Sequence, residues 1–417
     1  MTTEIILDLE VNGDRLLSGL ADLAQIGARD DGACCRLALT DEDRAGRDWV
    51  AQRMRELGLE VKLDAIGNMF GVRPGRDRAS APVMTGSHID TVRSGGAYDG
   101  NLGVLGGLEV VATLNEANLS TARDIVVAVF TNEEGARFAP DMMGSLVYVG
   151  GMTLDEALST NAIDGAVLGD ELQRIGYAGD MPLGLYQPHA FVELHIEQGP
   201  VLDMEGIRLG AVQNLQGISW QEVIVTGQSN HAGTTPMRLR RDAGYAACAI
   251  ATFVRDLAKD MGGNQVATVG KIDLKPNLIN VIASKALLTV DLRNTDEALL
   301  KQAEKRFAAF LDTQREQEGV EIATRRLARF EPVQFDLTLA KRIEDNANAL
   351  GLSCRPMTSG AGHDAQMLAR ICPSAMIFVP SVDGISHNPA EHTKADDLVA
   401  GTNVLLHTLW QLSNQEA

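Results

Sequence analysis

The feature that most constrains this chain is a glycine-rich segment that carries two potential metal ligands. His88 and Asp99 lie within Gly86–Gly100, among small residues where a buried core would need bulk. A second polar segment, Thr131–Gly135, directly follows the apolar run Asp124–Phe130, whose pattern predicts a buried strand. Functional side chains of α/β sheets collect at the carboxyl ends of strands. The two segments therefore predict a metal-dependent hydrolase site at one edge of such a sheet.

The length and composition of the chain indicate an α/β protein of two domains. A chain of 417 residues exceeds the roughly 250–300 residues that one hydrophobic core usually serves. A charged fraction of 22%, an aromatic fraction of 4% and 41 glycines are typical of a loop-rich globular protein. The net charge of -19 argues against nucleic-acid binding, which draws its affinity from clustered Lys and Arg.

Cysteine usage and the N-terminus predict a cytoplasmic protein. The five cysteines are an odd number, and Cys34 and Cys35 are neighbours, which suits no ordinary disulfide framework. Met1–Glu10 is acidic and lacks the basic and apolar regions of a secretory or mitochondrial signal. The longest apolar stretches, such as Tyr245–Val254, fall short of the roughly 18 residues that cross a bilayer. We therefore expect no export and no membrane association.

Strand and helix patterns alternate along the first half of the chain. Strands are predicted at 83–86, 125–130 and 191–195, and helices at 40–57 and 103–115. This alternation is typical of a layered α/β sheet.

From about Gln213 the pattern changes to a compact β-α-β-β-α-β order. This order is that of a ferredoxin-like split βαβ module. We predict a mixed-sheet α/β/α metal-hydrolase domain at residues 1–212 and 330–417, with a ferredoxin-like α+β domain inserted at 213–329. The elements predicted in the insertion are strands at 218–226, 265–274, 281–292 and 320–327 and helices at 241–261 and 295–318.

Five side chains of metal-ligand type share a glycine-, proline- or polar-rich context at or just beyond a predicted strand end. Imidazole and carboxylate ligands suit zinc-like divalent ions, and five are enough for two ions. Any one of the histidines alone would more often be a structural or surface residue, so the prediction depends on the whole set. The candidate ligands are His88, Asp99, Glu134, His195 and His387.

Acidic residues beside these ligands admit more than one interpretation. Strand alternation places Asp90 where it can hydrogen-bond the ligating imidazole of His88, although an Asp there can also stabilise a turn. Adjacent Glu133 and Glu134 point in opposite directions in an extended chain, so one can bind metal while the other acts as a base. The alternative for this pair is a solvated acidic loop.

These motifs, in the order in which they occur along the chain, resemble those of the amidase/hydantoinase/carbamoylase family. That family includes N-carbamoyl-L-amino acid amidohydrolases, β-ureidopropionases of the di-zinc type and allantoate amidohydrolases, and it lies within the dinuclear aminoacylase/carboxypeptidase superfamily. The likeness extends over nearly the whole chain, from Gly67–Phe70 to His387–Glu391.

The resemblance implies a role for each candidate ligand. Asp99 would bridge two divalent metal ions, which are zinc or else manganese, cobalt or nickel. His88 and His195 would complete one metal site, and Glu134 and His387 the other.

The resemblance also implies the catalytic groups. Glu133 would be the general base that takes a proton from water and passes it to the leaving nitrogen. The inserted domain would be a lid and dimerisation domain. His231, within Ser229–Met237, would stabilise the tetrahedral oxyanion and would come from the partner subunit of a homodimer.

Further positions match substrate-binding segments of the family. Asn280 and Arg293 would hold the carboxylate of the substrate, a task that suits the planar fork of Arg. Gln198 and the loop that contains Gly360 and His363 would line the pocket. Taken without the resemblance, Arg293 would be interpreted as a solvated surface charge.

The reaction implied is hydrolysis of a carbamoyl C–N bond, which yields an amino acid, carbon dioxide and ammonia. An allantoate amidohydrolase is the main alternative, although the phrase Phe130–Phe138 looks more like carbamoylases and ureidopropionases. A peptidase or aminoacylase is disfavoured by His195 and by Gln198–Pro200. A non-catalytic binding protein on the same fold is disfavoured because the expected base and ligands are all present.

Overall fold

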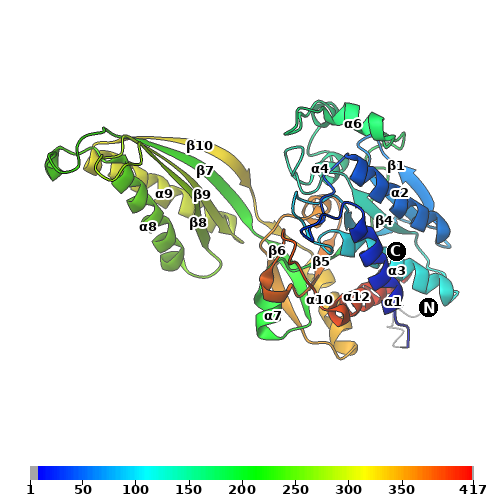
Figure 1. Ribbon diagram of the computed structural model, residues 1–417. Helices are drawn as coiled ribbons and strands as arrows, with labels where there is room; N and C mark the ends of the chain where they lie inside the picture. The colour runs from blue at the N-terminus through cyan, green and yellow to red at the C-terminus, as the bar shows by residue number, and fades with distance from the viewer. Residues whose placement is uncertain (1–7, 416–417) are drawn as a thin grey trace. The chain divides into compact units, whose positions relative to one another are not determined.

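The computed structural model describes residues 8–415 and divides the chain into two compact units (Figure 1). The first unit consists of the chain up to Gln213 and from Gln334 onward, and the second unit is the insertion Asn214–Val333. Within residues 8–415 none of the helices has the length and apolar character needed to span a membrane. The roles of the two units as a catalytic domain and a lid domain stay predictions.

A nine-stranded mixed sheet forms the centre of the first unit. Its order is β1-β2-β4-β3-β5-β13-β6-β11, and β12 pairs with β6. The middle of the sheet is parallel, because β3 pairs in parallel with β4 and β5, and β5 with β13. These four strands are fully buried, as expected of strands covered on both faces. The strands are β1 (Glu60–Leu63), β2 (Met69–Arg73), β3 (Val83–His88), β4 (Ile125–Phe130), β5 (Ala190–Ile196), β6 (Leu209–Leu215), β11 (Val333–Gln334), β12 (Cys354–Ser359) and β13 (Ser374–Val379).

Different helices cover the two faces of this sheet. Side chains alternate along β5, so Leu194 meets glycines of α3 and α12, whereas Glu193 reaches the start of α11. A Cβ on Gly103 of α3 would come within 2.7 Å of the Leu194 carbonyl oxygen, so the missing side chain lets this helix lie directly on the strands. The helices are α1 (Gly13–Gln25), α2 (Asp41–Glu56), α3 (Asn101–Glu116), α4 (Met143–Tyr148), α5 (Leu154–Leu158), α6 (Leu168–Ile175), α7 (Val201–Glu205), α10 (Leu337–Ala349), α11 (Asp364–Leu368) and α12 (Ala395–Asn414), with a 3-10 turn η2 (Val382–Gly384).

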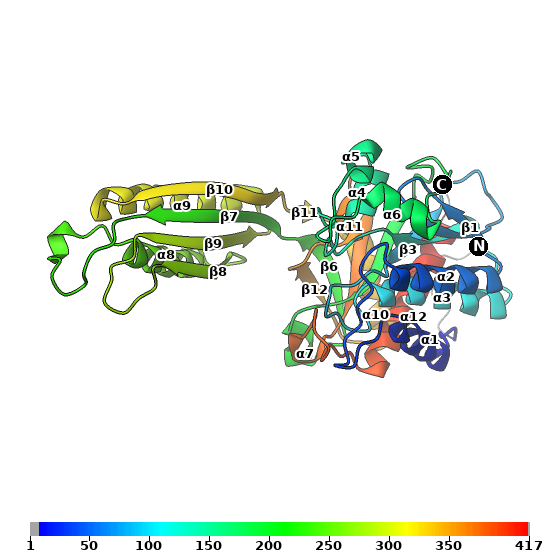
Figure 2. The same cartoon turned by 45° about the horizontal axis from the view of Figure 1, so that its top comes forward.

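The second unit is a four-stranded antiparallel sheet with two helices on one face (Figure 2). Its strand order is β10-β7-β9-β8. Alternate residues of β9 are buried and form a small core with apolar residues of α8 and α9. The β-α-β-β-α-β order agrees with the order expected from the sequence. The elements are β7 (Gly217–Thr226), η1 (Met237–Leu239), α8 (Ala243–Met261), β8 (Val266–Lys275), β9 (Lys285–Asn294), α9 (Glu297–Glu318) and β10 (Glu321–Phe330).

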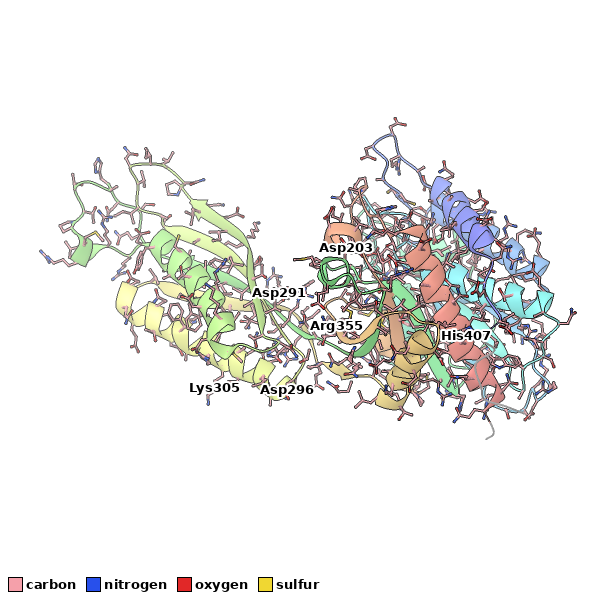
Figure 3. The ribbon with its side chains drawn as sticks, turned by 90° about the horizontal axis from the view of Figure 1, so that it is seen from below. Asp203, Asp291, Asp296, Lys305, Arg355 and His407 are labelled. Atoms are coloured by element: carbon pink, nitrogen blue, oxygen red, sulfur yellow. The ribbon has the colours of Figure 1, made fainter. Side chains whose placement is uncertain are left out.

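Side-chain caps decide where the helices of the second unit begin. Asp242 accepts hydrogen bonds from the first N–H groups of α8, and Asp296 (Figure 3) does the same for α9. Both helices therefore begin two residues later than the apolar pattern predicts, because the capping residue itself is not helical. β9 also begins later than predicted, at Lys285, since Val281 belongs to an isolated bridge with His231.

Candidate metal centre

The predicted ligands lie at the carboxyl ends of neighbouring parallel strands. His88 is the last residue of β3, and His195 lies near the end of β5. Glu134 follows β4, which ends at Phe130, and His387 lies in the loop after β13. Because β4, β3, β5 and β13 are adjacent in the sheet, the fold delivers these side chains to one edge.

Asp99 lies at the centre of this group. Its Oδ1 is 3.6 Å from His88 Nε2 and 3.2 Å from His195 Nε2. Its Oδ2 is 3.3 Å from His387 Nε2. The next residue, Gly100, has a φ of 65°, and a Cβ there would come within 2.5 Å of His88 Nε2. Asp99 thus turns its two oxygens toward two different sets of side chains, as a bridging ligand does.

Two overlapping groups of potential ligand atoms share Asp99. His88, Asp99 and His195 form one group, and Asp99, Glu134 and His387 form the other, with the ligand atoms of each group within 4.8 Å of one another. Glu134 Oε2 is 3.3 Å from His387 Nε2. The structure therefore brings the five predicted ligands together, and their imidazole and carboxylate atoms are the donor set of a zinc-type divalent site.

Backbone carbonyls orient the two histidines of the first group. His88 Nδ1 is 2.9 Å from the carbonyl oxygen of Asp90, and His195 Nδ1 is 2.9 Å from that of Ile196. A carbonyl only accepts, so each neutral ring carries its proton on Nδ1 and leaves a lone pair on Nε2. The Gly100 N–H, which donates to His195 Nε2 over 3.2 Å, requires the same tautomer. Both rings thus present Nε2 in the form that binds a metal.

The carboxylate of Asp90 does not make the contact predicted for it. Its Oδ1 is 3.9 Å from His88 Nδ1, which is beyond hydrogen-bond distance. Its two oxygens instead accept from the backbone N–H groups of Glu133 and Glu134, each over 3.2 Å. Asp90 therefore orients the imidazole through its main chain, because its side chain is already engaged in holding the acidic loop.

Glu133 and Glu134 point to different parts of the centre, as expected of neighbours in an extended chain. Glu133 Oε2 is 3.4 Å from His88 Nε2, whereas Glu134 belongs to the other ligand group. Before them, the Asn132 side chain donates to two carbonyls of the following loop, over 2.8 and 3.2 Å. This braced turn sets the directions of both carboxylates.

Three loops of the centre contain a non-glycine residue in the left-handed backbone region. The φ angles are 56° at Asn132, 56° at Gln198 and 54° at His387. Each such residue costs on the order of 1 kcal/mol or more and persists only where its surroundings fix it. The three residues follow β4, β5 and β13. The surroundings of these three residues therefore fix the backbone conformation at this edge of the sheet.

The centre contains more buried carboxyl groups than its histidines can neutralise. Burial raises the pKa of Glu134 to about 8 and raises the pKa of Glu133 well above its ordinary value. A hydrogen bond to Asp99 raises the pKa of His387 to about 9. Burial opposes ionisation of Asp99 too, but hydrogen bonds with the histidines hold its pKa well below the usual range. Without bound cations, the carboxylates and histidines of the centre retain extra protons. Divalent metal ions suit this site because their positive charge would replace those protons.

Gln198, predicted to bind substrate, contacts the ligands themselves. Its Nε2 donates to Asp99 Oδ2 over 2.8 Å and lies 3.4 Å from His387 Nε2. The preceding Glu197 accepts from the first two N–H groups of α7, each over 2.8 Å, and so fixes this turn. Gln198 therefore lies within the centre, and its contact with substrate stays a prediction.

The predicted pocket loop at residues 360–364 approaches the centre beside His195. The ring centroid of His363 is 4.5 Å from that of His195, and its Nε2 is 3.0 Å from Ser359 Oγ. Burial holds the pKa of His363 well below its ordinary value, so this ring is neutral. Gly360 directly follows β12 and has open space where a Cβ would lie.

Two residues to which the sequence pattern assigned no role, Ser386 and Glu391, hold Asp99 in place. Glu391 Oε1 accepts from the N–H groups of Tyr98 and Asp99, over 3.0 and 3.2 Å. Ser386 Oγ is 3.1 Å from Asp99 Oδ2 and 3.0 Å from Glu391 Oε2. A Cβ on Gly96 would meet Glu391 Oε1 at 2.2 Å. In the sequence, Gly96 indicates that another group approaches the backbone closely, but it does not show that this group is Glu391.

Glu193 is another residue that the sequence pattern missed. It lies on the same face of β5 as His195 and is fully buried. It accepts from Ser87 Oγ over 2.6 Å and from the Ala365 N–H over 2.8 Å, and thereby links β3, β5 and α11. A charge inside the apolar strand Phe191–His195 was the signal that could have found it.

In the second unit, His231 and Asn280 lie side by side. The Ala232 N–H donates to the Asn280 carbonyl over 2.9 Å, and His231 pairs with Val281 in an isolated antiparallel bridge. The loop after β7 and the segment before β9 thus form one end of this unit.

Arg293 lies toward the other end of the same sheet. It pairs with Ile218 on β7, whereas the His231 loop follows Thr226 at the far end of that strand. The eight residue steps from Ile218 to Thr226 span roughly 26 Å at ~3.3 Å per residue. Asp291 (Figure 3) holds the guanidinium through a 2.9 Å ion pair between Nη2 and Oδ2. Within one chain, the sheet separates Arg293 from the His231 loop.

Comparison with known proteins agrees with this geometry. The model of peptidase family M20/M25/M40 matches residues 84–411. Over 399 residues the chain is 42% identical to a Rhizobium meliloti protein named N-carbamoyl-L-amino-acid amidohydrolase, with 96% of each chain covered. It is 37% identical over 400 residues to the allantoate amidohydrolase of Escherichia coli, with 94% of this chain and 96% of that protein covered. A crystal structure from Burkholderia multivorans, described as an amidase of the hydantoinase/carbamoylase family, has a TM-score of 0.96 at 44% identity and covers 98% of this chain and 100% of that one.

Proposed function

The chain belongs to peptidase family M20/M25/M40, a family of hydrolases, and we propose that it hydrolyses the carbamoyl C–N bond of an N-carbamoyl-L-amino acid or of N-carbamoyl-β-alanine. The products are the amino acid, carbon dioxide and ammonia. The observation that carries the proposal is a pair of ligand groups that share Asp99, with the buried carboxylate of Glu133 beside them. Relatives named for carbamoyl amino acids and for allantoate support the ureido class of substrate.

The two ligand groups hold two divalent metal ions in this proposal. Bound there, the ions supply Lewis acidity and lower the pKa of water. Asp99 would be shared by the two ions, with His88 and His195 holding one and Glu134 and His387 holding the other. The nitrogen and oxygen donors accept Zn, Mn, Co or Ni.

Glu133 is the general base in this proposal. Its Oε2 lies 3.4 Å from His88 Nε2, and burial raises its pKa, which makes the ionised carboxylate a stronger base than a surface glutamate. It takes a proton from the attacking water and gives it to the leaving nitrogen. Gln198, His363 and the backbone at Gly360 contact the substrate beside the ligands.

The oxyanion donor and the carboxylate-binding arginine come from two copies of the chain in this proposal. A ureido acid is far shorter than the stretch of β7 that separates Arg293 from the His231 loop. His231 of one copy therefore donates to the oxyanion of a substrate whose carboxylate is held by Asn280 of the same copy and by Arg293 of the other copy. A homodimer joined through the second unit meets this requirement, and domain motion can bring the groups together and apart.

Mixing two inactive variants tests this shared site. His231→Ala and Glu133→Gln each disable every site of their own homodimer. A mixed dimer regains one site with both wild-type groups, so subunit exchange is expected to restore up to about a quarter of wild-type activity. Continued inactivity of a demonstrably exchanged mixture would place both groups on one chain and contradict the dimeric site.

Allantoate is the second candidate substrate, because an allantoate amidohydrolase is similar over 94% of this chain. The phrase Phe130–Phe138 favours carbamoyl substrates by family resemblance alone, because its last two side chains make structural contacts. Arg137 forms ion pairs with Asp164 and Glu171, at 3.0 and 2.8 Å, and Phe138 lies in the core, so both side chains serve the fold. The choice between the substrates therefore depends on the pocket.

Ammonia release from metal-loaded protein tests the proposed reaction. N-carbamoyl-L-methionine, N-carbamoyl-β-alanine and allantoate are assayed in parallel, with Glu133→Gln as the control. Turnover of a carbamoyl compound that disappears in the control is expected. Turnover of allantoate alone would move the assignment to that substrate, and activity only toward acylated amino acids or peptides would contradict the ureido class.

The proposed location is the cytoplasm. All five cysteines are free thiols in the structure, which suits a reducing compartment. Retention of activity in the soluble cell fraction, beside a cytoplasmic marker enzyme, is the expected result.

A further inference from the structure

His231 lies in a tight turn whose backbone N–H groups point at its own ring. The Gly233 N–H donates to His231 Nδ1 over 3.0 Å, and the Thr234 N–H lies 3.3 Å from the same atom. A backbone N–H can only donate, so Nδ1 must be an acceptor and cannot carry a proton in this geometry. The neutral ring therefore carries its proton on Nε2, the tautomer opposite to that of His88 and His195.

The opposite tautomers suit opposite tasks. A metal ligand needs a lone pair on the atom that faces the metal, and His88 and His195 keep Nε2 unprotonated through carbonyls at Nδ1. A hydrogen-bond donor to a developing oxyanion needs a proton on the atom that faces the substrate. His231 supplies an Nε2–H donor without having to be charged.

The turn itself is held by one arginine. Arg240 Nε donates to the Thr235 carbonyl over 3.1 Å, and Arg240 Nη2 donates to the Ala232 carbonyl over 2.5 Å. These carbonyls flank the two residues, Gly233 and Thr234, whose N–H groups meet the ring. A single planar guanidinium thus fixes both sides of the turn, which the point charge of a lysine cannot do.

Two further contacts make the turn specific. Thr235 Oγ1 donates to the His231 carbonyl over 2.8 Å and closes the turn from within. A Cβ on Gly233 would lie 3.3 Å from His231 Cε1, so a side chain there would push against the imidazole. A side chain at position 233 would therefore require the ring to shift by a few tenths of an ångström.

We propose that Arg240 is a positioning residue for the reaction, which fixes the turn 232–235 and thereby holds His231 as the neutral Nε2–H donor. The role rests on the proposed function, in which His231 donates to the oxyanion. Arg240 acts only through the turn and does not touch the substrate.

The tautomer is measured by long-range ¹⁵N NMR of histidine-labelled, metal-loaded full-length protein at pH 8, where an ordinary imidazole is neutral. The His231 signals are identified by their loss in His231→Asn. The wild-type ring is expected as the Nε2–H tautomer. In Arg240→Ala it is expected as a mixture of the two tautomers, with kcat lowered roughly tenfold and KM nearly unchanged.

The neighbouring Arg238 provides the matched control, because it is exposed and its loss changes the net charge equally. Arg238→Ala is expected to leave both the tautomer and kcat unchanged, and Arg240→Lys to lie between wild type and Arg240→Ala. Gly233→Ala perturbs the ring without touching the arginine and is expected to mix the tautomers as well, which keeps the test available if Arg240→Ala does not fold.

Two results would overturn the proposal. One is a wild-type His231 that carries its proton on Nδ1, and the other is an Arg240→Ala protein that loses activity while its ring stays entirely Nε2–H. The spectra need no substrate, so a wrong substrate class leaves this test intact. A wrong tautomer would remove the positioning role even if carbamoyl turnover were established.

Discussion

The metal centre is assembled from several strands of the central sheet, whereas the His231 turn is one short local segment. Four ligands of the centre lie at or beyond the ends of adjacent buried strands, and His88 and His195 are 2% and 1% exposed, whereas His387 is exposed. The His231 turn is exposed and is held by its own backbone and by Arg240. The centre must confine several like charges, which requires a rigid buried frame. The turn must only aim one N–H, which a short local motif can do.

Glu133→Gln tests the first region and is expected to have the largest effect. The amide keeps the size of the side chain but cannot take a proton, so kcat is expected to fall by roughly 10³-fold. Metal content, measured by elemental analysis, is expected to stay at the wild-type value because Glu133 is not a ligand in this account. A parallel loss of metal would show that the residue holds an ion and would remove the base from the mechanism.

His231→Ala tests the second region and is expected to have the next largest effect. Loss of one oxyanion donor lowers kcat by about 10²-fold, with metal content and thermal stability unchanged because the residue is exposed. His231→Asn, which can still donate a hydrogen bond, is expected to recover part of the rate. Equal kcat values for wild type and His231→Ala would mean that the exposed turn takes no part in the reaction.

Arg293→Ala sharpens the comparison by separating binding from chemistry. Hydrogen bonds to charged groups contribute about 1.5–3 kcal/mol, so KM for a carboxylate substrate is expected to rise roughly tenfold or more while kcat changes little. Arg325→Ala, on the exposed strand β10 of the same sheet, is the matched control. Unchanged kinetics in Arg293→Ala would exclude the residue from carboxylate binding.

The pH dependence of metal-free protein is expected to show the smallest effect. The pKa of Glu134 is raised to about 8 and that of His387 to about 9, so both groups bind protons more tightly in the folded than in the unfolded chain. The stability they contribute is complete at acid pH and is lost as pH rises through these values.

Differential scanning calorimetry of chelator-treated protein checks this sign. Between pH 5 and pH 9 the Tm is expected to fall on the order of 5 °C, and saturating divalent metal is expected to abolish most of that fall. A metal-free Tm that rises over the same range would contradict the charge balance described for the centre.

The sequence predicts which side chains meet in the candidate centre, because these residues leave a local record. His88 and His195 lie at or near the ends of apolar strands, Glu134 and His387 follow two others, and the carboxyl ends of parallel strands meet at one edge. The side-chain contacts of Asp90 were not predictable in this way. Its carboxylate is taken by two backbone N–H groups of a loop more than 40 residues away, at Glu133 and Glu134, which no local pattern records.

Residues that act only through distant partners escaped prediction for the same reason. Glu391 holds the Asp99 loop across 292 residues of sequence, and Glu193 bonds Ser87 across 106. The sequence contains only indirect signs of these contacts, namely a glycine at position 96 and a charged residue within an apolar strand. The role predicted for the His231 turn rests on family resemblance, because its glycine-flanked loop is only a weak signal of function.

The metal stoichiometry of wild type and Asp99→Asn tests the central claim most directly, because Asp99 is the side chain that the two ligand groups share. The substitution keeps the size of the side chain but removes its charge and one metal-binding oxygen. Calorimetric titration with Zn²⁺ or Mn²⁺, together with elemental analysis, is expected to give two ions per wild-type chain and fewer than one for Asp99→Asn. A wild-type chain that binds one ion, or an Asp99→Asn chain that keeps two, would contradict a centre built on a bridging carboxylate.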